Sequence, residues 1–316
     1  MRLKSTVALP LAALLLGGAP ASAKDVKITY IQGVTGNPFY TSVSCGGADA
    51  AKKLGVTFEA QGPQQFTPSL QMRVLDAVIA SKPDGILFTA DDPVALTPTL
   101  LQAKEMGIKI LSIDGDLTDM SVAVANIQAD NYDGGRQAGE RLVQLLGGKG
   151  EVMAVMNSPA PSVSQQRLQG FKDAIAKAPG ISFLGVQYSN NQTAKAASII
   201  TATVAAHPDL AGVFALTTNN TEGVATGVRE AQREGKIKIV GFDTSDPIVE
   251  AIRSGIVSAD VVQYPYHVGE LGVQMMVDAL NGKPVEREVH TPFVIATPEN
   301  VDTPEVQKYI YKTHCS

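Results

Sequence analysis

Short apolar runs alternate with amphipathic stretches along almost the whole chain. The run VKITYIQ at 26–32 precedes a helical pattern near 40–53, and the alternation continues to a helical pattern near 266–281. The other predicted helices lie near 69–81, 93–106, 132–147, 163–177, 193–206, 221–234 and 247–254. Near-continuous apolar strands separated by amphipathic helices are typical of parallel sheets that are covered on both faces. The pattern therefore predicts an α/β fold of doubly wound parallel sheets.

The number of strand and helix units indicates two domains. Roughly ten units occur, which is too many for one strongly twisted open sheet. In the stretch 121–135, polar residues follow the strand at once, which suggests a change of domain. Pro265 interrupts a strand pattern at 261–267 and cannot donate to a ladder. The stretch after Pro284 is a third candidate crossing.

The residues that follow the predicted strands are mostly Asn, Gln and Asp, with an arginine and a few aromatics. They are Asn37, Phe39, Tyr40, Gln64, Gln65, Phe66, Asp91, Asp92, Asp114, Asp116, Ser158, Ser162, Arg167, Asn190, Asn191, Asn219, Asn220, Asp243 and Gln263. In open α/β sheets, ligands bind beyond the carboxyl ends of the strands. Carboxamides donate and accept, carboxylates accept, and a flat aromatic ring covers the apolar face of a sugar. The set favours a neutral polyhydroxylated ligand.

Each of these residues, taken singly, also has a plainer interpretation. An oxygen acceptor after a strand is often only the N-cap of the next helix, an alternative open for Asp91, Asp116, Asn190 and Asn219. Arg167 alone could be a surface charge, and Phe39 with Tyr40 could be a hydrophobic staple on the first helix. The ligand hypothesis therefore rests on the set.

Composition and charge narrow the class of protein. Of the 316 residues, 44% are hydrophobic and 18% charged, which is a globular composition. The net charge of -5 and the lack of a basic run argue against a nucleic-acid partner. The four histidines are scattered without metal-ligand spacing, so we expect neither a metal ion nor another cofactor.

The N-terminal residues are predicted to form an export signal. Residues 1–23 combine a basic start, an apolar centre and a small-residue ASA end, typical of a secretory signal peptide. We expect cleavage after Ala23 and a soluble exported protein, and the resemblance given below makes that compartment the periplasm. In an oxidising compartment Cys45 and Cys315 could pair, and the alternative is two separate thiols.

Several motifs together resemble the periplasmic sugar-binding proteins of the ribose-binding type. They are GNPFY, DNYDGG, RLQGF, HPDLAGVFALTTN, VGFD and VVQYPYHVGELG, in family order and at family-like spacing between about 25 and 297. These proteins are the soluble receptors of ABC importers. The resemblance implies two α/β lobes joined by a three-stranded hinge, with the ligand in the interdomain cleft. The implied lobes are 24–126 with 264–288 and 127–263 with 289–300, followed by a tail at 301–316.

The resemblance also implies roles for individual residues. Asn37 would hydrogen-bond ligand hydroxyls, Phe39 and Tyr40 would flank the ring, and Asp114 would accept hydroxyls from the first lobe. The second lobe and the hinge would contribute Arg167, Asn191, Asn219, Asn220, Asp243 and Gln263, and Phe66, Asp116 and Ser162 are further candidates. If the tail returns to the first lobe, Cys315 could reach Cys45 on the first helix.

Three positions depart from the family pattern. Gly115 stands where the family often has an arginine, and Asn191 stands near the position of a second-lobe aromatic. The loop LTTNN before the helix near 221 is longer than usual, so Asn219 and Asn220 are alternatives for one role. These changes affect which sugar the site can bind. The missing arginine and the missing aromatic favour a small sugar or polyol.

The expected function is a monomeric periplasmic solute-binding protein that captures a neutral monosaccharide or polyol and delivers it to an ABC permease. Presentation of the bound sugar to a chemoreceptor is an alternative. A repressor would need a DNA-binding helix-turn-helix where the export signal lies. An exported glycoside hydrolase would use paired carboxylates such as Asp91 with Asp92 or Asp114 with Asp116. The adjacent Asp91 and Asp92 would point apart on a strand, and no Ser/His/Asp or metal-ligand cluster appears in the sequence. We therefore expect no enzyme.

Overall fold

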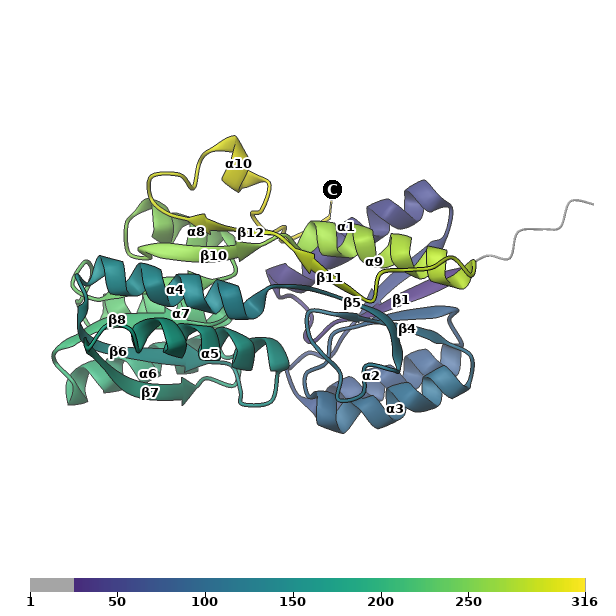
Figure 1. Ribbon diagram of the computed structural model, residues 1–316, viewed down its shortest axis with the longest axis horizontal. Coiled ribbons are helices and arrows are strands. Elements are labelled where there is room, and N and C mark those ends of the chain that lie inside the picture. The colour runs from purple at the N-terminus through teal and green to yellow at the C-terminus, as the bar shows by residue number, and fades with distance from the viewer. Residues whose placement is uncertain (1–25, 316) are drawn as a thin grey trace, which may run out of the picture.

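The computed structural model describes residues 26–315, which form two lobes side by side (Figure 1). Each lobe contains a six-stranded sheet with helices on its faces. The strand orders are β11-β5-β4-β3-β1-β2 and β12-β10-β9-β8-β6-β7, and every neighbouring pair is parallel except β10 with β12. The prediction of two doubly wound parallel-sheet domains is confirmed. The predicted signal peptide and its predicted cleavage site lie outside the described residues.

The N-terminal lobe is built from the first part of the chain and one later segment. Its elements are β1 (Lys27–Ile31), α1 (Pro38–Leu54), β2 (Thr57–Gln61), α2 (Pro68–Ser81), β3 (Gly85–Phe88), α3 (Pro93–Glu105), β4 (Lys109–Ile113), β5 (Ala123–Ala129), α9 (Pro265–Leu280) and β11 (Glu288–Thr291). The strands β3 and β4 are buried along almost their whole length, as a sheet covered on both faces requires.

The C-terminal lobe repeats this architecture. Its elements are α4 (Asn131–Leu145), β6 (Lys149–Met156), α5 (Ser162–Ile175), β7 (Gly180–Tyr188), α6 (Thr193–Ala206), β8 (Leu210–Ala215), α7 (Thr218–Glu230), β9 (Lys238–Phe242), α8 (Asp246–Arg253), β10 (Ala259–Gln263), β12 (Phe293–Ala296) and α10 (Pro304–Gln307). All nine helices expected from the sequence occur within a few residues of their predicted positions.

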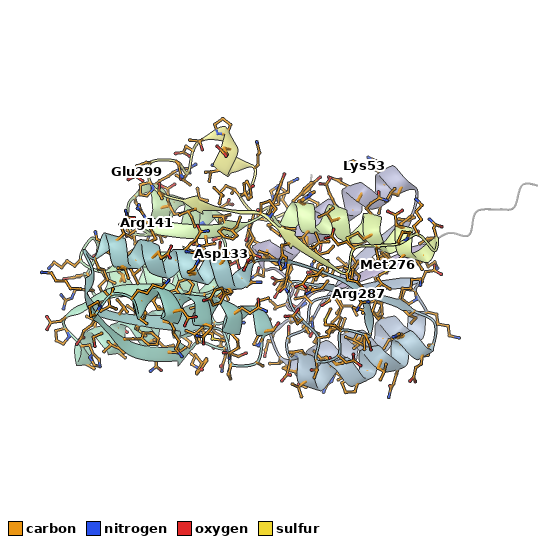
Figure 2. All side chains as sticks on the ribbon, in the orientation of Figure 1. Lys53, Asp133, Arg141, Met276, Arg287 and Glu299 are labelled. Atoms are coloured by element: carbon orange, nitrogen blue, oxygen red, sulfur yellow. A yellow bond between two sulfur atoms is a disulfide. The ribbon has the colours of Figure 1, made fainter. Side chains whose placement is uncertain are left out.

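The chain passes between the lobes three times: from β5 to α4, from β10 to α9, and from β11 to β12. The first and third crossings come about three residues later than the sequence suggested, because β11 pairs with β5 up to Thr291 and Ala129. Arg287 supports this pairing by donating to the carbonyls of Ala123 and Met120 (Figure 2). Residues 127–129 and 289–291 therefore lie in the N-terminal sheet.

Helix α7 begins earlier than predicted. Thr217 is its N-cap and accepts from the backbone N–H of Asn220. The sequence suggested a long loop up to Asn220, so this part of the prediction is wrong. Thr218 to Asn220 form the first helical turn, and the side chain of Asn220 points to Ser189 rather than into a loop.

Two glycines allow α4 and α5 to lie in close contact. A Cβ atom on Gly135 would lie 1.9 Å from the carbonyl oxygen of Arg167, and one on Gly170 would lie 2.0 Å from that of Tyr132. Only glycine fits at such backbone contacts. The close contact fixes the position of Arg167 along α5 relative to α4.

The C-terminal tail connects both lobes. Val301 and Val306 are buried in the core, and Arg253 on α8 forms an ion pair with Asp302. Farther along, the backbone N–H of Lys312 donates to Ser42 on α1. Cys315 then forms a disulfide with Cys45 on α1.

Apolar side chains fill the space between helices and sheets in both lobes (Figure 2). Met276 on α9, for example, lies directly over Gly85 of β3. Among the described helices, none has the length and apolar character needed to cross a bilayer.

Candidate functional site

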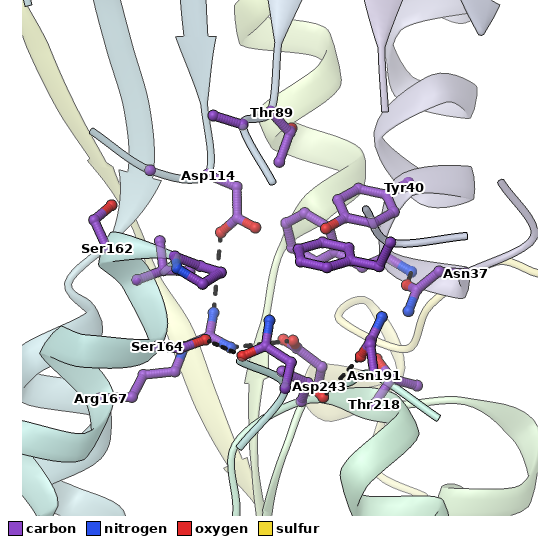
Figure 3. A pocket seen from close by; sticks show the side chains of 18 of the residues that line it. Asn37, Tyr40, Thr89, Asp114, Ser162, Ser164, Arg167, Asn191, Thr218 and Asp243 are labelled. Carbon is purple, nitrogen blue, oxygen red and sulfur yellow. Dashed lines mark hydrogen bonds and ion pairs between the residues drawn. The ribbon is translucent and has the colours of Figure 1, made fainter. Parts of the chain in front are cut away.

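A cavity lies between the lobes at the carboxyl ends of both sheets, as expected for this fold. It has about 40 Å³ of space for the centre of a water-sized sphere. Figure 3 shows Asn37, Tyr40 and Asp114 of the N-terminal lobe facing Arg167, Asn191 and Asp243 of the C-terminal lobe. The remaining walls come from Phe39, Phe66, Thr89, Ala90, Pro93, Gly115, Asp116, Asn157, Pro161, Ser162, Val163, Ser164, Thr217 and Thr218.

The start of α1 provides one wall. Asn37 caps the helix by accepting from the N–H of Phe39 at 2.9 Å, while its amide donates across the cavity to Asn219 at 2.9 Å. Phe39 and Tyr40 are buried with their rings edge-to-face at 5.4 Å. Burial raises the pKa of Tyr40 well above its usual value, so its hydroxyl stays protonated.

Asp114 faces the cavity from the end of β4. It has φ of 54°, an uncommon left-handed conformation of the kind that clusters at ligand sites. Burial raises the pKa of Asp114 to about 7, although the charge of Arg167 opposes the rise. Its Oδ1 has no hydrogen-bond partner among residues 26–315 and lies 3.9 Å from Arg167 Nη2.

Arg167 is a buried cation that is fixed on three sides. The side chain is 2% exposed, Nε donates to Asn131 at 2.8 Å, and Nη1 donates to the carbonyl of Leu216 at 2.9 Å. The guanidinium lies 3.7 Å above the ring of Phe242. Nη2 has no hydrogen-bond partner among the described residues and faces Asp114. One rigid donor therefore stays available to a ligand.

Asp243, at the end of β9, has φ of 71° and is held by several donors. Its Oδ2 lies 3.4 Å from Arg167 Nη1. Its Oδ1 accepts from Gln263 at 2.8 Å and from the hydroxyl of Tyr311 at 2.5 Å. These contacts fix the plane of the carboxyl group.

Asp116 connects the two lobes. Its Oδ1 accepts from Asn126 and Gln128 of β5, at 2.9 and 3.2 Å. Across the cleft, its Oδ2 accepts from Gln166 at 3.0 Å, and its backbone N–H donates to Ser162 at 3.0 Å. The structure is thus a closed arrangement of the lobes.

Gly115 has a geometric reason for departing from the family pattern. It has φ of 145°, and a Cβ atom there would lie 3.2 Å from the Oγ of Ser162. A side chain at this position would adopt an unfavourable backbone conformation and lie close to Ser162, so glycine fits here better than the arginine that the family often has.

Ten of the thirteen predicted ligand residues line the cavity: Asn37, Phe39, Tyr40, Phe66, Asp114, Asp116, Ser162, Arg167, Asn191 and Asp243. Three do not. Gln263 lies behind Asp243, Asn219 reaches Asn37 at the outer edge, and Asn220 is buried against Ser189.

The alternative interpretations of the strand-end residues, as helix caps or as a surface charge, are wrong at the five positions given next. The cap of α3 is Asp92 rather than Asp91, and the cap of α7 is Thr217 rather than Asn219. Neither Asp116 nor Asn190 caps a helix. Arg167 is not a surface charge.

Sequence reasoning missed several wall and support residues. Thr89, Asn157, Ser164 and Thr218 line the cavity, but hydroxyl and amide groups this common carry little signal. Asn131 stands in the DNYDGG motif, which was noticed without a role for the asparagine. Tyr311 was missed because it lies in the tail, far along the chain from the strand ends.

Within residues 26–315, no group of three or more His, Cys, Asp or Glu side chains could hold a metal ion. The cavity brings together one arginine, three acids, several amides and hydroxyls, and three aromatic rings. Such a set suits reversible hydrogen bonding to a small polar molecule.

The chain resembles known proteins over most of its length. The family model for the periplasmic binding protein domain matches residues 28–284. The D-ribose/D-allose-binding protein of Pseudomonas aeruginosa is 28% identical over 283 residues, which cover 86% of this chain and 88% of the relative.

Two solved structures share the fold closely. An ABC transporter solute-binding protein from Agrobacterium vitis, bound with α-D-tagatopyranose, is 35% identical with a TM-score of 0.88, and the match covers 91% of this chain and 99% of that one. A second solute-binding protein from Agrobacterium vitis, with bound D-fucose, is 28% identical with a TM-score of 0.87, covering 90% and 100%.

Proposed function

This chain belongs to the periplasmic binding protein family, and from that premise we propose that it captures a neutral monosaccharide or polyol in the cavity between its lobes. The observation that carries the proposal is a pair of buried polar atoms, Asp114 Oδ1 and Arg167 Nη2, which form an ion pair at 3.9 Å across the two lobes but have no hydrogen-bond partner among the described residues. Buried polar atoms without a partner are costly, and a bound molecule that both donates and accepts would satisfy both.

A sugar ring fits the other groups in the cavity. Its hydroxyls would donate to Asp114 and Asp243 and accept from Arg167, while Asn37 and Asn191 could do both. Phe39 and Tyr40 would cover an apolar face of the ring. The relatives named above bind ribose, allose, tagatose or fucose according to their descriptions, which supports a sugar as the ligand class here.

Capture would follow from closure of the lobes about the three crossings. A ligand that contacts both lobes favours the closed arrangement by its differential affinity for that state. Asp116 and Asn37 would hold the closed form through their contacts with Ser162 and Asn219. We propose that this form, in the periplasm, docks on an ABC permease and releases the sugar there unchanged.

A thermal-shift screen of sugars and polyols tests the proposal. The panel should include ribose, allose, tagatose, fucose, arabinose and the common hexoses, pentoses and polyols. A ligand at 100 times its dissociation constant should stabilise the protein by about 2.7 kcal/mol. The proposal fails if no carbohydrate in the panel shifts the melting temperature.

The matched variants are Arg167→Ala and Gln102→Ala. The first should remove the shift for any sugar that binds the wild type, because the fixed donor is lost. The second changes an exposed residue on α3 that is not part of the cavity lining, and it should leave the shift intact.

A further inference from the structure

A second, larger hollow opens outwards from the cavity. We refer to it as the outer groove, and it has about 650 Å³ of space for the centre of a water-sized sphere. Asn37, Phe66, Asn191 and Thr218 line both the cavity and the outer groove, so the two hollows adjoin each other. The groove is present in the closed arrangement of the lobes, in which Asn37 already contacts Asn219.

The outer groove is rich in carboxamides that come from both lobes. Apart from the shared Asn37 and Asn191, they are Gln64, Gln65, Asn190, Gln192 and Asn219. Gln64, Gln65 and Gln192 are exposed, so their amides are accessible to a ligand. No lysine, arginine or histidine is among the described residues that line the groove. Such walls suit a neutral molecule with many hydroxyls and provide no positive charge to pair with an anion.

Asp91 adds an unsatisfied polar group to the groove wall. It is 1% exposed, and neither carboxyl oxygen has a hydrogen-bond partner among residues 26–315. Burial, with a smaller contribution from the charge of Asp92, raises the pKa of Asp91 to about 9. The carboxyl group is therefore neutral at pH 7, and it can donate one hydrogen bond and accept others.

Phe66 provides the apolar contact at the junction. It lies in the loop between β2 and α2, is half-buried, and lines both hollows. A ring that leaves the cavity towards the groove would pass this aromatic side chain, which can cover the apolar face of a sugar.

We propose that the outer groove is a second subsite, and this proposal rests on the function proposed above. The subsite accepts a further neutral polyhydroxylated unit that is covalently joined to the ring in the cavity. The ligand class then includes glycosides and disaccharides. Amides from both lobes would contact this second unit, so it would add to the differential affinity for the closed state.

Calorimetric titration with matched ligands tests the proposal. The probes are each monosaccharide that gives a thermal shift, its α- and β-methyl glycosides, and disaccharides that carry the same sugar at the non-reducing end. We expect at least one disaccharide to bind as tightly as its parent monosaccharide or more tightly.

Two sets of variants locate the second unit. The double variant Gln64→Ala with Gln65→Ala, and separately Gln192→Ala, should weaken disaccharide binding by about tenfold, since one or two hydrogen bonds are lost. Neither change should alter monosaccharide binding. Gln102→Ala is the control, because it removes an exposed amide elsewhere and should change neither affinity.

The outcomes separate this proposal from the one on which it rests. If monosaccharides bind but every methyl glycoside and disaccharide fails, the groove is not a subsite and the monosaccharide function stands. If a disaccharide binds with an affinity that the groove variants leave unchanged, the groove proposal is likewise overturned. If no carbohydrate binds at all, both proposals fail.

Discussion

At the scale of single residues, the site depends on side chains whose conformational freedom is restricted by contacts with neighbouring residues. Asn131, Leu216 and Phe242 fix Arg167, while Gln263 and Tyr311 fix Asp243. Preorganised groups of this kind reduce the entropy lost on binding. Residues placed directly after strands were predictable, since the fold dictates where ligands bind. The supporting residues were not, because their role depends on contacts between distant segments.

Asp114 should make sugar affinity depend on pH. Its pKa of about 7 in the empty closed form means that acidification protonates the carboxylate, which can then accept fewer hydrogen bonds from hydroxyls. Between pH 8 and pH 6 we expect the dissociation constant to rise by up to about tenfold. Calorimetry at several pH values measures this change.

The variant Asp114→Asn is the control, and it should bind the sugar more weakly with a dissociation constant that does not depend on pH. If the dissociation constant of this variant changes with pH as in the wild type, Asp114 is not the group that titrates.

Asp91 should make folding stability fall as pH rises. Its pKa is raised from 3.8 to about 9 on folding, so between these values the folded state holds a proton that the unfolded state releases. The stabilisation is complete below pH 3.8 and is lost as pH rises towards 9. Relative to the wild type, Asp91→Asn should gain about 4 kcal/mol between pH 5 and pH 8, because the two states differ by about one bound proton over three pH units. Urea unfolding at both pH values measures the difference, and a constant difference would contradict the assignment.

At the scale of elements, the register of helices and strands determines which side chains reach the site. Alternating apolar and amphipathic stretches predicted nearly all helices, since the buried faces repeat regularly. The start of α7 was misjudged because Thr217 and Asn219 are both plausible N-caps, and only the tertiary contact of Asn220 with Ser189 distinguishes them. Likewise, β5 and β11 are longer than predicted because they pair with each other. Pairing between segments so far apart in the chain is not visible in the local sequence.

Close contact between α4 and α5 should matter for binding as well as for stability. In Gly135→Ala the new Cβ would collide with the backbone of Arg167, so the helices must separate. We expect a loss of about 1–3 kcal/mol in unfolding free energy, together with weaker sugar binding. Thermal unfolding and calorimetry measure the two effects.

Gly227→Ala is the matched control for this contact. A Cβ at Gly227 would lie 2.6 Å from the carbonyl of Ala197, between α7 and α6 and away from the cavity lining. It should destabilise the protein while leaving sugar affinity unchanged. Equal losses of affinity in both variants would show that general destabilisation is the cause.

At the scale of the whole molecule, two lobes and three crossings produce one closed cavity, and the tail adds a fourth connection. Tyr311 contacts Asp243 of the C-terminal lobe, and the next residue, Lys312, contacts Ser42 of the N-terminal lobe. The two-lobe architecture was predictable from the number of strand and helix units. The return of the tail to the N-terminal lobe was suggested by the possible pairing of Cys315 with Cys45. Its contact with Asp243 of the C-terminal lobe was not predictable, because no local pattern in 301–316 indicates where these residues pack.

The disulfide between Cys45 and Cys315 should stabilise the folded protein. It closes a loop across a sequence separation of 270 residues, which restricts the unfolded chain. The double variant Cys45→Ser with Cys315→Ser should lose about 2–4 kcal/mol of unfolding free energy. Urea unfolding with and without a reductant measures this loss. The reductant should destabilise the wild type and have no effect on the double variant, and any other pattern would contradict a disulfide in the folded protein.

The most direct test of the account is a crystal structure with the sugar that gives the largest thermal shift. We predict that the ring lies between the lobes, against Phe39 and Tyr40, with hydroxyls on Asp114, Arg167 and Asp243. A sugar bound elsewhere on the molecule, or one that touches only a single lobe, would contradict capture by closure.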